Sequence, residues 1–271
     1  MRATEGYFSH DDGVFEPLPT ASSGWHPKQL RGPAVTGLLA RAAEQACPAQ
    51  DRQPARATFE LFRPALMTAS TMRATVVRSG RRLTLVDSEM VQGGVVVARA
   101  HVLFLALSEN PEGRLWAADG HPDPPPAGVR SDEEGRVYQS HGGAWTPEPA
   151  DHYNEHAKAV WQEPLTIVHG EPPTPFQCVA STSDLTSLVV HWGDRGVEYI
   201  NADVSVALSR LPIGPGLGVV VNHRSAEAGI SAGTALLFDR QGTLGSASVV
   251  GLANADKAVT VGRHSQATTA R

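Results

Sequence analysis

The second half of this 271-residue chain repeats the first half at a fixed spacing. The segment Phe59–Pro64 returns as Val206–Pro212, which places the arginine of the second copy, Arg210, 147 residues after Arg63. The same spacing places Ala100 on Ala247. A unit of this length that occurs only twice is too long for a solenoid, so the repeat predicts a duplicated domain.

Each copy has the pattern of one helix followed by several strands. In the first copy, Val35–Ala46 carries Leu and Ala at helical spacing, and Pro48 marks its end. Strand candidates rich in Val, Thr, Leu and Phe follow at hairpin distances: 56–63, 68–77, 81–90 and 95–107. The second copy shows a helix around 177–192 and strands at 196–209, 217–225, 234–240 and 245–253. This order predicts an α+β fold in which a helix packs on an antiparallel sheet, twice.

The composition between the copies predicts where the domains divide. We expect an N-terminal repeat at 1–107 and a C-terminal repeat at 165–255. The segment 108–164 contains a proline run and an acidic run, which are typical of a linker, with one edge strand expected at Gly135–Ser140. The polar end of the chain, 256–271, is expected to be a flexible tail.

Charge, hydropathy and cysteine content exclude several classes of function. The net charge of −5, without a basic block, argues against a nucleic-acid partner. The longest mostly apolar stretch, Val95–Leu107, is too short to span a membrane, and no secretion signal is expected at the N-terminus. Cys47 and Cys178 lie far apart, which favours free thiols in a reducing, cytoplasmic compartment. His152 and His156 have metal-ligand spacing without an obvious third ligand, so neither a metal nor another cofactor is expected.

Several segments, in the same order and spacing, resemble the acyl-CoA thioesterase II-like family. In the first half these are 57–64, 78–83 and 97–100, and in the second half 164–165, 170–171, 175–177, 199–205 and 238–245. The resemblance extends over residues 24–253 and implies a double hotdog fold, with two tandem repeats that each wrap an antiparallel sheet around one central helix. It also implies further association of copies, so a homo-oligomer is expected.

The resemblance assigns roles to particular residues of this chain. In the family, a carboxylate on the second-half helix activates a water, and this carboxylate corresponds to Asp184. The family threonine that helps to hold the water corresponds to Asn201, and the family glutamine corresponds to Val249. Thr186 and Ser187 take the place of an Asn-Gly pair that follows the aspartate in many relatives.

The first half lacks an equivalent of the candidate base. The position 147 residues before Asp184 is Gly37, which predicts one catalytic centre and a close approach of backbone or ligand at this glycine. We therefore interpret Asp184 and Asn201 as catalytic residues, and Gly37, Thr186, Ser187 and Val249 as substrate-binding residues.

The function expected from the resemblance is hydrolysis of acyl thioesters of coenzyme A or of an acyl carrier protein. Two alternatives remain open. Val249 has no polar group to orient a water, which favours a protein that binds acyl thioesters without hydrolysing them. The same scaffold also supports a dehydratase, an isomerase or a cyclase of a biosynthetic pathway. Neither Ser205 nor Ser209 lies in a Gly-x-Ser-x-Gly elbow, which argues against an α/β-hydrolase by pattern.

Overall fold

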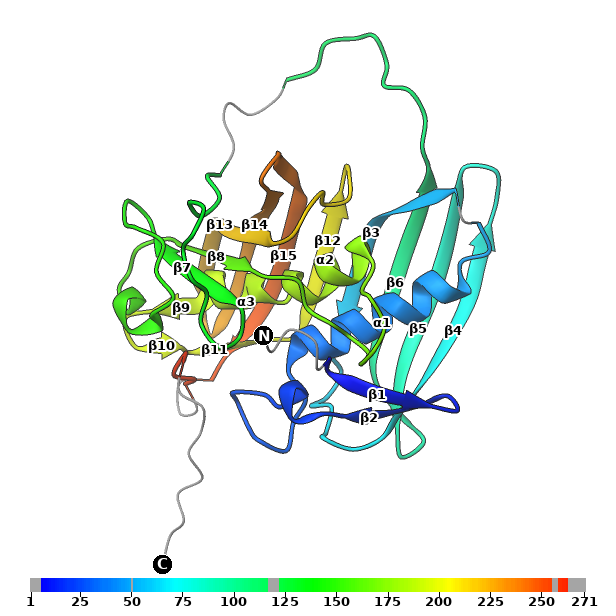
Figure 1. The fold of residues 1–271 in the computed structure, drawn as a ribbon, viewed down its shortest axis with the longest axis horizontal. Coiled ribbons are helices and arrows are strands. Elements are labelled where there is room, and N and C mark those ends of the chain that lie inside the picture. The colour runs from blue at the N-terminus through cyan, green and yellow to red at the C-terminus, as the bar shows by residue number, and fades with distance from the viewer. Residues whose placement is uncertain (1–5, 50, 117–121, 255–257, 263–271) are drawn as a thin grey trace, which may run out of the picture.

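The chain folds around one long antiparallel sheet whose two halves have matching strand orders (Figure 1). The structure is a computed structural model, and it describes residues 6–49, 51–116, 122–254 and 258–262. The strand order is β1-β2-β4-β5-β6-β3 in one half and β12-β15-β14-β13-β8-β7 in the other, and β11 also pairs with β15. The expected α+β architecture, with mostly antiparallel strands and few helices, is confirmed.

The first half consists of one helix and six strands, with a short 3-10 helix before the long one. Their bounds are β1 (Phe8–Asp11), β2 (Val14–Pro17), η1 (Pro19–Ala21), α1 (Gly32–Ala46), β3 (Arg52–Glu60), β4 (Ser70–Ser79), β5 (Leu83–Gln92) and β6 (Val95–Ala106).

The second half contains a pair of consecutive helices in place of the single helix. Its elements are β7 (Arg136–Ser140), η2 (Pro149–His152), β8 (Lys158–Gln162), α2 (Pro175–Ser183), α3 (Leu185–His191), β11 (Tyr199–Asn201), β12 (Asp203–Leu208), β13 (Leu217–Glu227), β14 (Ile230–Asp239) and β15 (Gly242–Ala253). A separate two-stranded sheet is formed by β9 (Trp192–Gly193) and β10 (Gly196–Val197).

The repeat found in the sequence is also the symmetry of the sheet. Strands β4, β5 and β6 begin 147 residues before β13, β14 and β15. At the centre of the sheet, Thr58 of β3 lies opposite Ser205 of β12, its repeat equivalent, and the Ser205 hydroxyl donates to Thr58 Oγ1 at 3.3 Å. Because equivalent residues face each other there, the pseudo-twofold axis that relates the halves passes between these two strands.

The helix expected around 177–192 is divided into α2 and α3 at Asp184, and the expectation of one continuous helix was wrong. Ser181 donates to the Pro33 carbonyl oxygen of α1 and so connects the two helices. Ser183 donates within its own helix, to the Ala180 carbonyl oxygen at 2.8 Å, and a bond of this kind weakens the regular helical ladder and bends helices. Asp184, at the break, is partly buried, whereas most of its neighbours on both helices are buried.

The segment 108–164 is more than the linker that composition predicted. It contains the expected edge strand, β7, but also β8, which pairs with β13 and so belongs to the second half of the sheet. Part of the predicted tail is also ordered, because Val259 forms a bridge with Val197. The remaining tail residues, 256–257 and 263–271, lie outside the described residues. All five residues of β8 are buried, including the consecutive apolar residues 159–161, which places this strand in the sheet despite its proline-rich and acidic surroundings.

The helices lie on one face of the sheet and bury its central hydrophobic core. Leu38 and Leu39 of α1, Phe59 of β3 and Val179 of α2 are completely inaccessible to solvent and belong to one cluster.

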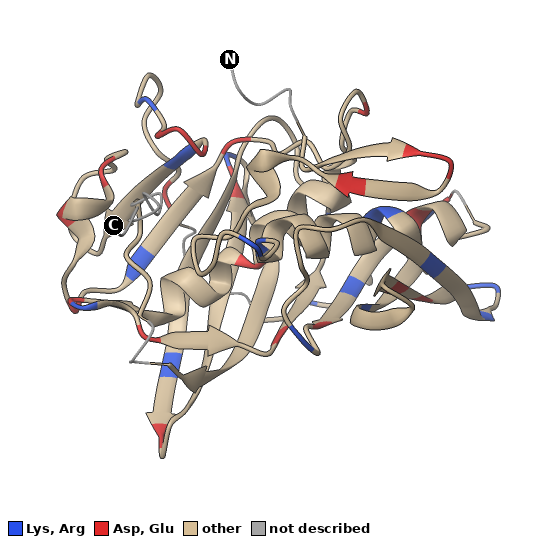
Figure 2. Cartoon of the chain, turned by 90° about the horizontal axis from the view of Figure 1, so that it is seen from below, with Lys and Arg blue, Asp and Glu red and all other residues tan. Residues whose placement is uncertain are grey.

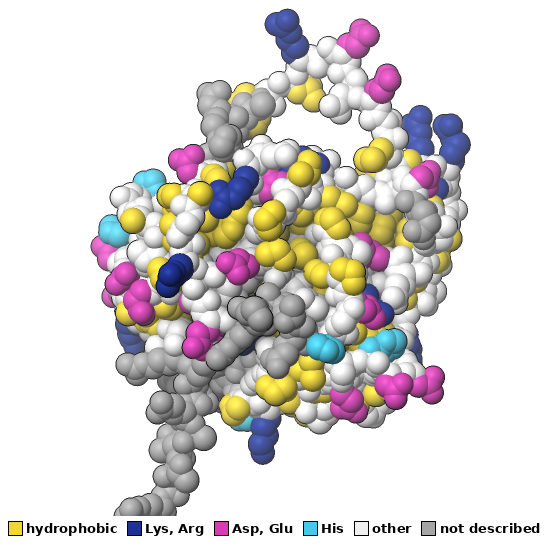
Figure 3. All heavy atoms as spheres, in the orientation of Figure 1, with side chains coloured by type: hydrophobic (Ala, Val, Ile, Leu, Met, Phe, Trp, Pro, Cys, Tyr) yellow, Lys and Arg dark blue, Asp and Glu magenta, His cyan; other side chains and the backbone are white. Residues whose placement is uncertain are grey.

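Lys and Arg are interspersed with Asp and Glu over strands and loops, as Figure 2 shows. Figure 3 shows hydrophobic side chains gathered across the middle of the helix-bearing face. Among the described residues, no helix has both the length and the apolar character needed to cross a membrane.

Candidate active site

Asp184 occupies the junction of α2 and α3, where it ends one helix and begins the next. Its side chain is partly buried, and Asn201 Nδ2 of β11 donates a hydrogen bond to its Oδ1 at 3.2 Å. The two residues that the family resemblance assigned to catalysis therefore lie in direct contact. Since Asn201 also donates to the Asp203 carbonyl oxygen at 3.4 Å, its amide orientation is held from a second side.

The environment of Asp184 favours the protonated carboxyl. Burial raises its pKa from 3.8 to about 6, while the hydrogen bond from Asn201 and the positive charge of Arg136 act in the opposite direction. A carboxyl group with this pKa is ionised at neutral pH and is still basic enough to accept a proton. This combination is what general base catalysis near neutral pH requires.

Gly32, the first residue of α1, lies directly against the Asp184 carboxylate. A Cβ atom at this position would collide with both carboxylate oxygens and with Cγ of Asp184. The absence of a side chain therefore brings the first turn of α1 to the reactive group. Gly32 was not among the site residues predicted from the sequence, although Gly32-Pro33 at the start of a helix was a visible signal.

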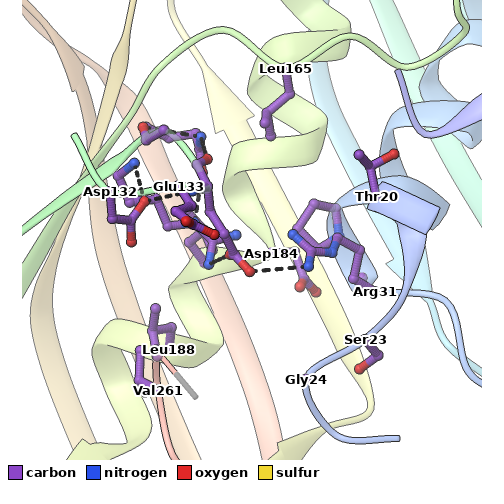
Figure 4. A pocket seen from close by; sticks show the side chains of 18 of the residues that line it. Thr20, Ser23, Gly24, Arg31, Asp132, Glu133, Leu165, Asp184, Leu188 and Val261 are labelled. Atoms are coloured by element: carbon purple, nitrogen blue, oxygen red, sulfur yellow. Dashed lines mark hydrogen bonds and ion pairs between the residues drawn. The ribbon is translucent and has the colours of Figure 1, made fainter. Parts of the chain in front are cut away.

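A cavity of about 1440 Å³ opens beside Asp184. Its walls come from distant parts of the chain: the loop before α1, the acidic segment before β7, the start of α3, and the ordered residues 259–262. In Figure 4, Asp184 lies between Arg31 on one side and Asp132 and Glu133 on the other, with Leu188 and Val261 below. Strand β11 contributes Asn201 to the same wall.

Glu134 links the two halves across this cavity. Its Oε1 pairs with Arg31 Nη2 at 3.1 Å, and its Oε2 pairs with Arg136 Nη1 at 2.5 Å. Arg31 is the N-cap residue of α1, and Arg136 begins β7. None of these three residues was proposed from the sequence. Glu134 lies in the acidic run 131–135, which has the composition of a solvated linker.

The other residues predicted to bind substrate are not gathered at one place. Ser187 lines the cavity, whereas among the described residues Gly37, Thr186 and Val249 lie away from it. A Cβ atom at Gly37 would meet Ile167 and, at 2.8 Å, Ser181 Oγ, so this glycine permits close packing of α1 against the second half. Val249 is buried in the main core, and Thr186 is buried with no hydrogen-bond partner among the described residues. The alternation of β15 explains Val249, because its side chain points to the core face.

Ser187 is held by its own helix. Its Oγ lies 3.3 Å from Nδ1 of His191, one turn further along α3. Burial lowers the pKa of His191 to about 4, so its imidazole is neutral at neutral pH.

The described residues contain no group of three or more His, Cys, Asp or Glu side chains that could hold a metal ion.

The fold is shared with solved hotdog proteins. An acyl-CoA thioesterase II, TesB2, from Mycobacterium marinum has 15% sequence identity and a TM-score of 0.62, with 94% of this chain and 96% of that chain covered. A protein with a hot dog fold from Alicyclobacillus acidocaldarius has 18% identity and a TM-score of 0.67, with 91% and 95% covered. A search of curated proteins found no match. The chain is therefore a hotdog-fold protein.

Two family profiles narrow this class. The acyl-CoA thioesterase N-terminal domain matches residues 21–105, and the acyl-CoA thioesterase C-terminal domain matches residues 111–248. Together they include most of the chain, which belongs to the acyl-CoA thioesterase family.

Proposed function

We propose that this protein hydrolyses acyl thioesters of coenzyme A or of an acyl carrier protein, with Asp184 as the general base. The observation that carries the proposal is the position of Asp184: a partly buried carboxyl with a pKa of about 6, bonded to Asn201 and exposed to a large cavity. Membership in the acyl-CoA thioesterase family supports the substrate class.

In the proposed reaction, ionised Asp184 accepts a proton from a water molecule as that water attacks the thioester carbonyl carbon. The new carbon–oxygen bond forms while the carbonyl π electrons move to the oxygen. Asn201 orients the Asp184 carboxylate through its 3.2 Å hydrogen bond. The first turn of α1, which begins at Gly32, supplies the positive end of a helix dipole for the developing oxyanion. The intermediate then collapses, the carbon–sulfur bond breaks, and Asp184 returns the proton to the thiolate.

The proposal includes the architecture in which the site is built. The matched half-sheets and the central Thr58–Ser205 contact support a double hotdog with one active site. We place the start of the second repeat before β7 rather than at residue 165, because β7 and β8 complete its sheet. The acyl group lies in the cavity beside Ser187, and copies of the chain associate further into a homo-oligomer.

One observation favours the second candidate, an acyl-thioester-binding protein without hydrolysis. Val249, at the position of the family glutamine, is 1% exposed and belongs to the hydrophobic core. It offers no hydrogen bond to a water. In the hydrolytic proposal, the Asn201 amide and the α1 N-terminus replace that contribution.

Release of free thiol from short, medium and long acyl-CoAs tests the proposal. We expect Asp184→Asn to lower turnover by about 10³-fold, the magnitude of a lost general base. Glu44→Gln is the matched control, because Glu44 is also a partly buried carboxyl with a raised pKa, caused by burial, but it bonds Thr174 and Gln177 away from the cavity. Unchanged turnover in Asp184→Asn would exclude this mechanism, and binding without thiol release in the wild type would favour the second candidate.

A further inference from the structure

Glu134 is the only carboxylate among the described residues that pairs with two arginines at once. Both guanidinium groups are largely buried: the Arg31 side chain is 19% exposed and that of Arg136 is 11% exposed. Each has a second anchor, since Arg31 Nε donates to the Ser22 carbonyl oxygen at 2.9 Å and Arg136 Nε donates to Gln162 Oε1 at 2.8 Å. The bridge therefore joins two fixed walls of the cavity.

Arg31, at one end of this bridge, directly precedes Gly32, the residue that touches the candidate base Asp184. Arg31 is the N-cap of α1, and the Cα of Gly32 lies against the Asp184 carboxylate. The other end, Arg136, acts on Asp184 through its charge. Glu134 itself is held in place by a short turn, because its backbone N–H donates to Asp132 Oδ1 at 2.9 Å.

The charges around Asp184 come from several elements. Among the described residues, the cavity is lined by two cations, Arg31 and Arg136, and by five further carboxylates, namely Asp132, Glu133, Glu134, Glu148 and Glu163. Tyr7 and Tyr138 also line it, and burial raises the pKa of each, so both stay uncharged. Asp132 accepts hydrogen bonds from the Arg136 backbone N–H and the Tyr138 hydroxyl, and Glu163 accepts one from Ser131. Glu134 pairs with both arginines.

We propose that Glu134 is a positioning residue of the active site: by bridging Arg31 and Arg136 it holds the first turn of α1 against Asp184 and balances the positive charge beside the reacting carboxylate. The inference rests on the proposed role of Asp184 as the base. Without the carboxylate, two unbalanced guanidinium groups would stabilise ionised Asp184 and make it a weaker base. Without Arg136, the remaining negative charge would have the opposite effect.

This difference in sign separates an electrostatic role from a merely structural one. Glu134→Gln and Arg136→Gln break the same ion pair, so a structural role predicts similar changes in both variants. The proposal predicts that the acidic limb of the pH–rate profile moves to lower pH in Glu134→Gln and to higher pH in Arg136→Gln, each by about one pH unit. Arg136→Lys restores the charge and should return the limb towards the wild-type position.

Glu163→Gln is the matched control, because it removes a carboxylate from the same cavity wall that pairs with neither arginine in the described structure. We expect its acidic limb to stay within a few tenths of a pH unit of wild type, since exposed and more distant charges are screened. Shifts of the same sign in Glu134→Gln and Arg136→Gln would overturn the proposal, as would shifts equal to that of the control.

A second measurement keeps this test independent of turnover. Carbon-13 NMR titration of the Asp184 carboxyl, assigned by its loss in Asp184→Asn, reports the same pKa in each intact variant. Opposite movements of that pKa with no thiol release would support the bridge and contradict the proposed hydrolysis. Thiol release that depends on Asp184, with no opposite movements, would support hydrolysis and refute the role of Glu134.

Discussion

The surroundings of Asp184 and of its repeat equivalent, Gly37, show how two copies of one structural unit have diverged. At Asp184 the helix breaks, the side chain is a carboxylate, and a cavity of about 1440 Å³ opens next to it. At Gly37 the helix continues without a break, and Ile167 and Ser181 fill the space that a side chain would need. The same position is thus open and polar in one half and closed and packed in the other.

The two positions differ because packing at Gly37 contributes to stability, whereas the carboxyl at Asp184 serves the proposed chemistry. Tight packing at Gly37 buries apolar surface and stabilises the contact between α1 and the second half. The partly buried carboxyl at Asp184 costs stability and is tolerated where chemistry requires it. The remaining symmetry, including the central pair of strands, leaves the scaffold the same on both sides.

The largest effect is expected from adding one methyl group to a glycine of α1, either at Gly32, which touches Asp184, or at the closed position Gly37. Gly32→Ala would push the Asp184 carboxylate away from Asn201, and we expect thiol release to fall by about 100-fold, because small misplacements of reacting groups have effects of this size.

Gly37→Ala is the matched variant, since it adds the same methyl group to the same helix. We expect it to lower the free energy of unfolding by about 1–3 kcal/mol through overpacking against Ile167, with turnover of the folded enzyme retained. Urea unfolding and thiol release on both variants test this pair. Equal losses of turnover in both would show that the two positions are not functionally distinct.

A loss of stability should follow from opening the closed position at Gly37. Ile167 is 1% exposed and packs on Gly37, so Ile167→Ala is expected to lower the free energy of unfolding by about 2–5 kcal/mol. Leu188→Ala, which removes a partly buried side chain from the wall of the open cavity, should cost clearly less. Urea denaturation of the two variants measures the difference, and a greater loss for Leu188→Ala would contradict our description of the closed position.

A pH-dependent change in stability sharpens the comparison, because it measures how much the partly buried carboxyl of Asp184 lowers the free energy of unfolding. At about pH 3, Asp184 is almost fully protonated in both the folded and the unfolded chain. As the pH rises from about 4 to about 6, the unfolded chain loses this proton while the folded chain retains it, so the wild type loses stability. Asp184→Asn should therefore be more stable than wild type by roughly 3 kcal/mol at most above pH 7, and equal to it at about pH 3. Thermal unfolding at both pH values tests this, and a stability difference that does not grow with pH would argue against the raised pKa.

Much of the fold was accessible from the sequence. The spacing of 147 residues placed three strand pairs correctly, because side chains that alternate between a core and a solvent face leave a local, repeated pattern. Strand β8 was missed because proline and acidic residues dominate its surroundings. The break at Asp184 was missed because apolar periodicity continues across it, while the bonds from Ser181 and Ser183 that accompany it depend on tertiary contacts or local geometry.

The sequence by itself determined the duplication, the succession of one helical segment and several strands along each half and, through the family resemblance, the assignment of Asp184 and Asn201 to one site. Only the tertiary structure decided that Gly32, Arg31, Glu134 and Arg136 surround the same carboxylate, and that Gly37, Thr186 and Val249 lie away from the cavity. The physical reason is that local periodicity encodes which face of an element is buried. Which polar groups converge on a cavity depends instead on the packing of segments more than one hundred residues apart, and no local pattern records that packing.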